Sequence, residues 1–157
     1  MTLRPTHPSA FAAAHRWDDA TLDTGLSTAP ARDDLVVEVH EDGALGRRWS
    51  SAEVEAAVAT LAGGLLAEGV EPGDVVAWRA PTRIGSLLAY RACWRVGAVA
   101  APGHPRAGEQ EAASILERVG ARLVLDLDDL PAGPALGAGE GRAAPPDLAV
   151  VLFTSGS

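Results

Sequence analysis

The chain of 157 residues contains no lysine, a single cysteine and few aromatic side chains. All 13 of its basic residues are therefore arginines. Because Cys93 has no second cysteine to pair with, an internal disulfide and a metal site built from several thiolates are both excluded. Aromatic residues make up 4% of the chain and apolar residues 47%, so the core must be built mainly from alanine, valine and leucine.

Positive charge is also scarce, since the formal net charge is −8 and the isoelectric point lies near 4.9. This balance excludes the basic surface that binds nucleic acid, and an anionic membrane surface would repel the chain. No apolar run approaches the ~18 residues that span a bilayer. Residues 1–8 lack the apolar segment of a signal peptide. We therefore expect a cytoplasmic protein with no nucleic-acid partner and no membrane span.

Two short apolar segments near the start, 35–40 and 45–49, flank a Glu-Asp-Gly turn and predict a β-hairpin. Ser50 and Glu53 then have the spacing of a capping box, which predicts that a helix begins there. The apolar residues that follow recur at the spacing of one helical face: Val54, Val58, Leu61 and Leu65.

Further along the chain, short apolar strands alternate with helices. The expected strands are 75–78, 98–101, 122–126 and 148–153, and the expected helices are 84–96 and 109–119. Continuous apolar strands that alternate with helices are typical of a parallel sheet covered on both faces. The sequence thus predicts an α/β fold, a mostly parallel sheet flanked by helices, with a hairpin near its start.

The composition divides the chain into a lead-in and one domain. Residues 1–34 are expected to be a partly ordered lead-in, with a short helix around 11–17. The domain is expected over 35–157, and within it the segment 127–146, rich in Gly, Ala, Pro and Asp, is expected to be a surface linker.

The last expected strand ends in a small loop of hydroxyl and glycine residues: Thr154, Ser155, Gly156 and Ser157. Backbone N–H groups and hydroxyls in such a loop surround a phosphate, and phosphate loops lie at the carboxyl ends of parallel strands. The alternative is an ordinary polar tail, because short Ser/Thr/Gly segments are common there.

Four stretches in order, at 49–54, 65–77, 92–102 and 147–157, resemble motifs of the adenylate-forming (AMP-binding) superfamily. That superfamily includes acyl-CoA synthetases and the adenylation domains of peptide synthetases, and Pro105-Arg106 followed by an acidic helix is closer to the former. The resemblance covers about 35–157. It implies that the chain is the N-terminal portion of an AMP-binding large domain.

By this resemblance the complete enzyme activates a carboxylic acid with ATP and Mg²⁺ to an acyl-adenylate. It then passes the acyl group to a thiol such as CoA or a carrier protein. Residues 154–157 are implied to be the ATP phosphate loop. The family's catalytic lysine and loop lysine have no counterpart in a chain without lysine, so no catalytic residue is assigned and the chain alone is expected to be inactive. The alternative is a non-catalytic half-domain that binds a partner chain supplying the missing segments.

Other candidate residues are interpreted structurally. Thr82 and His104 stand where the family commonly has asparagine or an acidic residue, and His104 is read as a turn residue. Cys93, within an apolar helix, is expected to be buried and inert. The acidic cluster at 126–129 is expected to be a solvated loop, so no metal site is assigned. The glycines of 137–141 are expected to belong to the linker.

Overall fold

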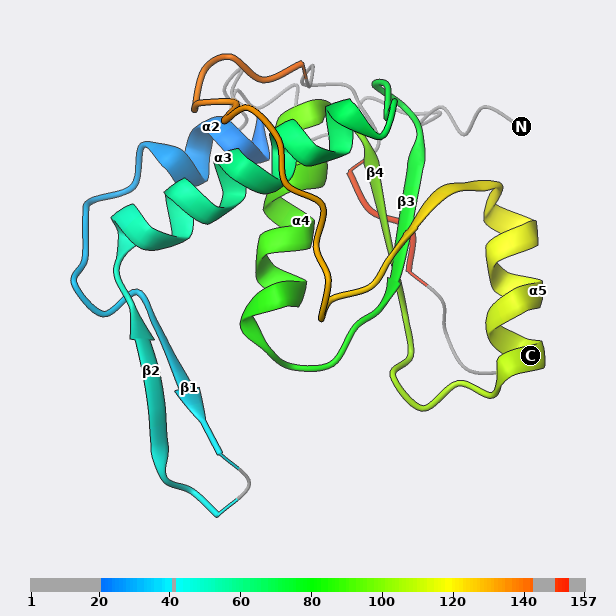
Figure 1. The fold of residues 1–157 in the computed structure, drawn as a ribbon, viewed down its shortest axis with the longest axis horizontal. Coiled ribbons are helices and arrows are strands. Elements are labelled where there is room, and N and C mark those ends of the chain that lie inside the picture. Colours follow the sequence, from blue (N-terminus) through cyan, green and yellow to red (C-terminus); the bar gives the residue numbers. More distant parts are fainter. Residues whose placement is uncertain (1–20, 41, 143–148, 153–157) are drawn as a thin grey trace, which may run out of the picture.

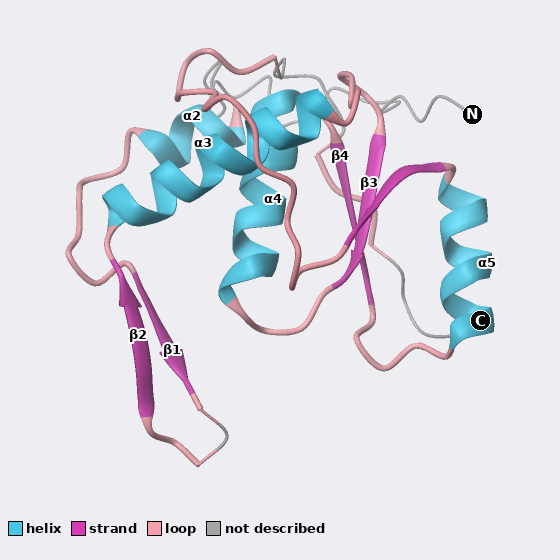
Figure 2. Cartoon of the chain, viewed as in Figure 1, coloured by secondary structure: helices cyan, strands magenta, loops and turns pink. Residues whose placement is uncertain are grey.

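The computed structural model describes residues 21–40, 42–142 and 149–152, and it has the α/β architecture that the sequence predicts (Figure 1). Figure 2 shows its helices and strands in the same view. The elements are α2 (Leu22–Ser27), β1 (Val36–Val39), β2 (Leu45–Trp49), α3 (Ser51–Ala67), β3 (Val75–Arg79), α4 (Ile84–Val96), β4 (Val99–Gly103), α5 (Glu109–Val119) and β5 (Ala121–Leu125). No helix among the described residues is long and apolar enough to cross a membrane.

The main sheet is parallel, with the strand order β4-β3-β5. Beyond β4, Val150 forms a parallel bridge with Ala100, so the described part of the expected last strand lies beside β4. The sequence predicted that β4 would stop before Pro102, but it continues to Gly103. The backbone N–H and C=O groups of Ala100 both bond to the 149–152 segment. Backbone groups alternate sides along a strand, so those of Pro102, two residues further on, also point away from β3. Its missing N–H therefore costs no bond to β3.

The predicted hairpin is confirmed: β1 and β2 pair antiparallel, with Val36 opposite Trp49 and Val39 opposite Leu45. It extends away from the rest of the molecule (Figure 1). At its base Val36 and Trp49 pack against the core, whereas Val39 and Leu45 at its far end are exposed.

The capping box at the start of α3 is also confirmed. The Ser50 hydroxyl accepts from the Glu53 N–H at 3.2 Å, and Glu53 accepts from the Ser50 N–H at 2.8 Å. All four residues of the predicted helical face are buried: Val54, Val58, Leu61 and Leu65. The helix therefore begins where local hydrogen bonding favours it and is held by its apolar face.

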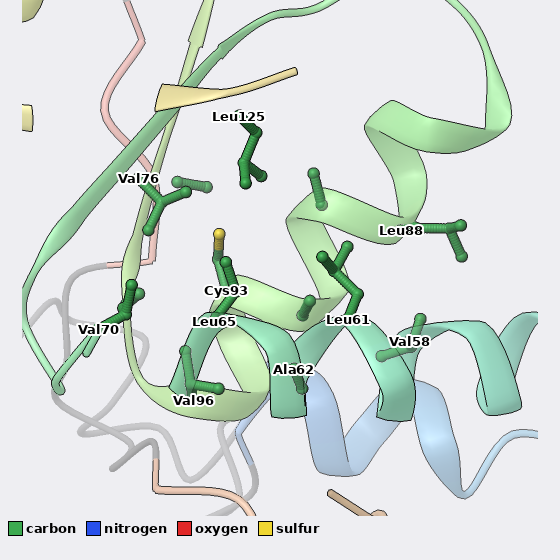
Figure 3. Close-up of a cluster of buried hydrophobic side chains, with 14 of the residues drawn as sticks. Val58, Leu61, Ala62, Leu65, Val70, Val76, Leu88, Cys93, Val96 and Leu125 are labelled. Carbon is green, nitrogen blue, oxygen red and sulfur yellow. The ribbon is translucent and has the colours of Figure 1, made fainter. Parts of the chain in front are cut away.

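The hydrophobic core lies between the sheet and the pair of helices α3 and α4. Side chains from both helices meet Val76 and Leu125 of the sheet, with Cys93 among them (Figure 3). Glycines in the left-handed conformation end the two later helices, Gly97 after α4 and Gly120 after α5. Both glycines stand where the sequence predicts that these helices end.

Two regions differ from a simple reading of the sequence. The expected lead-in contains the helix α2, which the sequence did not predict; the helix expected around 11–17 lies outside the described residues. The described part of the expected linker, 127–142, has no helix or strand, yet it runs closely along α3. There the N–H of Gly133 donates to the Thr60 carbonyl at 3.1 Å, and that of Leu136 to the Ala59 carbonyl at 3.0 Å.

Candidate functional site

The carboxyl ends of the parallel strands form one edge of the sheet. Arg79 at the end of β3 is the register partner of Gly103 at the end of β4, and Trp78 is the partner of Leu125 at the end of β5. Ligands of open α/β sheets bind outside this edge. The carboxyl edge is therefore the place to look for a site.

The segment 149–152 runs parallel to β4 and so heads toward the same edge. The Ala149 carbonyl accepts from the Ala100 N–H at 3.0 Å, and the Val151 N–H donates to the Ala100 carbonyl at 2.9 Å. The predicted phosphate-loop residues lie outside the described residues: Thr154, Ser155, Gly156 and Ser157. The structure shows the direction of the segment 149–152, which precedes these four residues in the chain.

A hollow of about 470 Å³ opens at the carboxyl edge between the loops that follow β3 and β5. Arg83 on its wall donates to Asp128 at 2.7 Å, and Asp126 accepts from the Asp128 backbone N–H at 2.9 Å. The acidic cluster at 126–129 therefore forms a turn and an exposed ion pair. Among the described residues, no group of three or more His, Cys, Asp or Glu side chains is arranged to hold a metal ion.

Arg79, a residue that the sequence analysis did not single out, also lines this hollow. Its side chain is exposed, and it makes no hydrogen bond or ion pair with another described residue. A guanidinium at the carboxyl edge is suited to an anion, because its N–H groups match phosphate or carboxylate oxygens. The signal in the sequence was a charged residue at the end of an apolar strand.

The two departures from the family motif lie in loops next to this edge. Thr82 and His104 are both exposed. His104 acts within its own turn, where its Nδ1 accepts from the Arg106 backbone N–H at 3.1 Å. The interpretation of His104 as a turn residue is consistent with this bond.

Cys93 is not suited to act as a nucleophile. Its side chain is fully buried in the core, and burial raises the pKa of its thiol to about 12. A thiol with so high a pKa is not ionised near neutral pH, and the thiolate is the reactive form. The prediction that Cys93 is buried is confirmed, and the raised pKa is consistent with an inert thiol.

The sequence analysis missed a buried ion pair between α4 and α2. Arg95 on α4 donates from Nη2 to Oδ1 of Asp23 on α2 at 2.8 Å, and both side chains are almost completely buried. Its Nη2 also lies 2.6 Å from Glu55 on α3, as an ion pair not aligned for a hydrogen bond. Burial by itself lowers the pKa of Arg95, but Asp23 and then Glu55 outweigh it and raise that pKa. Together with Glu55, the Asp23–Arg95 pair links the helices α2, α3 and α4, and its role is structural.

A family model described as "AMP-binding enzyme" matches residues 27–141. The chain is 30% identical over 124 residues to the medium-chain fatty-acid–CoA ligase of Escherichia coli K12, covering 78% of this chain and 21% of that protein. It is 37% identical over 131 residues to a feruloyl-CoA synthase from an Amycolatopsis species, covering 71% and 27%. The chain thus spans about a fifth to a quarter of the length of these relatives.

Solved structures resemble the chain as well. It superposes on the crystal structure of CmiS6 with a TM-score of 0.56 and 27% identity, covering 65% of this chain and 26% of that one. With an artificially fused adenylation–PCP di-domain, NpsA-ThdA from Klebsiella oxytoca, the TM-score is 0.65 at 20% identity, over 90% and 30%. The second likeness concerns the fold alone.

Proposed function

The chain belongs to the AMP-binding enzyme family, and we propose that it forms the N-terminal part of an adenylate-forming ligase of the acyl-CoA synthetase kind. Such a ligase activates a carboxylic acid with ATP to an acyl-adenylate and transfers the acyl group to a thiol. The observation that carries the proposal is that the relatives named above are a fatty-acid–CoA ligase and a feruloyl-CoA synthase. We therefore propose CoA, rather than a carrier protein, as the acceptor, and the cytoplasm, where ATP and CoA are available, as its location.

Within this proposal, Thr154, Ser155, Gly156 and Ser157 bind the ATP phosphates. The parallel bridge between Val150 and Ala100 supports it, because a chain leaving that strand continues at the carboxyl edge of the sheet. The guanidinium of Arg79 at this edge has no hydrogen bond or ion pair with another described residue and fits an anionic ligand. By the family resemblance, Mg²⁺ would bind together with ATP in the complete enzyme.

The 157 residues by themselves should not catalyse the reaction. The resemblance implies a lysine that neutralises charge during the attack on the α-phosphate, and the chain has none. Pyrophosphate release by the purified chain from ATP and a carboxylic acid would contradict this part of the proposal.

The test of the function uses the protein translated from the complete reading frame that holds this chain. ATP–pyrophosphate exchange is measured with aliphatic and aromatic carboxylic acids, followed by CoA thioester formation. Thr154→Ala and Ser157→Ala should each reduce exchange by roughly a hundredfold if they bind the phosphates in the transition state. The matched control is Ser114→Ala on the exposed side of α5, which should leave exchange unchanged.

The outcome also decides the alternative of a non-catalytic half-domain. If the reading frame encodes only this chain, and it folds only with a partner, the half-domain is supported and the ligase proposal fails. If the full protein exchanges pyrophosphate but the 154 and 157 variants equal the Ser114 control, the family reaction stands and the phosphate-loop assignment is wrong.

A further inference from the structure

The segment 149–152 lies beside β4 and pairs with it through backbone hydrogen bonds. It has no strand neighbour among the described residues other than β4, and its pairing there is the single bridge between Val150 and Ala100. Two backbone hydrogen bonds accompany that bridge. A shift of this segment by one residue relative to β4 would turn every side chain to the opposite face.

A third hydrogen bond comes from a side chain on α4. The indole Nε1 of Trp94 donates to the Ala149 carbonyl at 3.1 Å. The same carbonyl accepts from the Ala100 N–H at 3.0 Å. Because a carbonyl oxygen has two lone pairs, the two donors, from α4 and β4, occupy both.

The orientation of Trp94 is itself restricted by its aromatic neighbours. Its ring lies 5.6 Å from that of Tyr90, and Tyr90 meets Trp78 edge-on at 4.9 Å. Trp78 is buried in the core. The row of three rings thus runs from the core to the indole and holds its N–H toward the 149–152 segment.

We propose that Trp94 is a positioning residue that pins the register of the 149–152 segment through the Ala149 carbonyl and thereby supports the ATP binding proposed for the residues that follow it. The second half of this inference rests on the proposed function. A shift of one residue would turn the Ala149 carbonyl away from the indole and leave its N–H without this partner, and losing a hydrogen bond at this half-buried position is unfavourable. The indole thereby favours one register over its neighbours.

The first test uses the 157-residue chain and needs no activity. Trp94→Phe keeps an aromatic ring and removes the N–H donor. Hydrogen exchange of the Val151 amide, which bonds across the bridge, should become about fivefold faster, the effect of one ordinary hydrogen bond. Tyr90→Phe is the matched control, because it keeps the aromatic row and the Tyr90 hydroxyl makes no hydrogen bond with a described residue.

A second variant separates the hydrogen bond from packing. Replacement of Trp94 by 3-benzothienylalanine keeps the two-ring shape and substitutes sulfur for the N–H. It should reproduce the faster exchange at Val151 while the buried amide of Leu61 in α3 stays protected. If the Val151 amide of both Trp94 variants exchanges as slowly as in the wild type and in the Tyr90→Phe control, the proposed role of Trp94 is wrong.

The second test uses the protein from the complete reading frame. Trp94→Phe should raise the KM for ATP in pyrophosphate exchange about fivefold and leave the KM for the acid unchanged. A merely structural role would lower the active fraction and move neither KM, which would overturn the link to ATP. If the wild-type protein shows no exchange at all, the proposed function fails, while the exchange at Val151 still decides the pin.

Discussion

The two faces of the parallel sheet are covered to different degrees. On one face, α3 and α4 bury most of their apolar side chains, including Leu61, Leu65 and Ala92. On the other face lies α5, none of whose residues is buried. A groove of about 270 Å³ lies between α5 and the strands β3 and β4, and the small side chains of Ala77, Ala101 and Ala112 are part of its lining.

The difference shows that a helix's own pattern does not decide how closely it is packed. The sequence of α5 has a distinct apolar side, with Ile115 and Leu116, and a distinct acidic side. The sequence of α3 has apolar residues on most of its sides. The sheet, α4 and the 127–142 segment cover these sides from several directions. Amphipathic spacing predicts that a helix forms and which side faces inward, whereas the neighbours determine how much is buried.

The largest effect is expected from the buried ion pair on the α4 face. Asp23→Leu leaves Arg95 without its main partner and should lower the free energy of unfolding by about 3–5 kcal/mol, measured by urea denaturation. The exposed pair at the carboxyl edge is the control: Asp128→Ala removes the partner of Arg83 and should cost less than about 1 kcal/mol. Equal losses would mean that burial does not distinguish the two pairs.

The next effect concerns the close contact between α3 and the 127–142 segment. A Cβ added at Gly63 would overlap the Pro134 carbonyl, which is backbone and has no rotamer to move. Gly63→Ala should therefore destabilise the chain by about 3 kcal/mol, although alanine is favoured by about 1 kcal/mol within helices. Gly25→Ala in α2 has nothing within 4 Å of the new Cβ and should not destabilise. A thermal melt of both variants separates contact from helix propensity.

A pair of enlargements compares the two faces directly. Ala92→Val adds volume to a fully buried site on α4 and should cost about 2 kcal/mol. Ala112→Val points volume toward the groove beside α5 and should be neutral or stabilising by about 0.5 kcal/mol. If urea denaturation gives the same loss for both, the α5 face is packed as tightly as the other.

The smallest effect is expected at the start of α3, where Glu53 is exposed. The pKa of Glu53 is lowered, first by the hydrogen bond from the Ser50 backbone N–H and then by the Ser50 hydroxyl and Arg47. A lowered pKa in the folded state stabilises the fold above the ordinary value of 4.5, and this contribution is lost as the pH falls through the lowered pKa. The stability advantage of the wild type over Glu53→Gln should therefore shrink below that pH. An advantage that stays constant would show that the charge does not matter.

Much of the fold could be predicted because its signals are local. The Ser50–Glu53 spacing, the Gly97 and Gly120 stops and the turn at 41–43 each depend on a few neighbouring residues. The strand β4 is the instructive exception, since Pro102 suggested a break. Only the pairing on the two sides of β4 shows that the position of the missing Pro102 N–H faces away from β3.

The candidate site could be predicted only in part. The motif resemblance pointed to residues 154–157, which lie outside the described residues, so that assignment stays a prediction. The bond from Trp94 to Ala149 was missed, because these residues lie 55 positions apart and no local pattern links them. The place of Arg79 in the hollow at the carboxyl edge was missed as well. From the sequence, Trp94 was interpreted as an aromatic anchor of the core.

By itself, the sequence determined the order and type of most elements, the family, and the lack of any lysine for catalysis within these residues. Only the tertiary structure decided that Asp23 and Arg95 are a buried pair, that the glycines of α3 admit the 127–142 segment, and that β4 and Trp94 share one carbonyl. The physical reason is the separation along the sequence of the residues that interact. Capping, turns and periodicity act over a few residues, whereas burial and hydrogen bonding between distant segments exist only once the chain has folded.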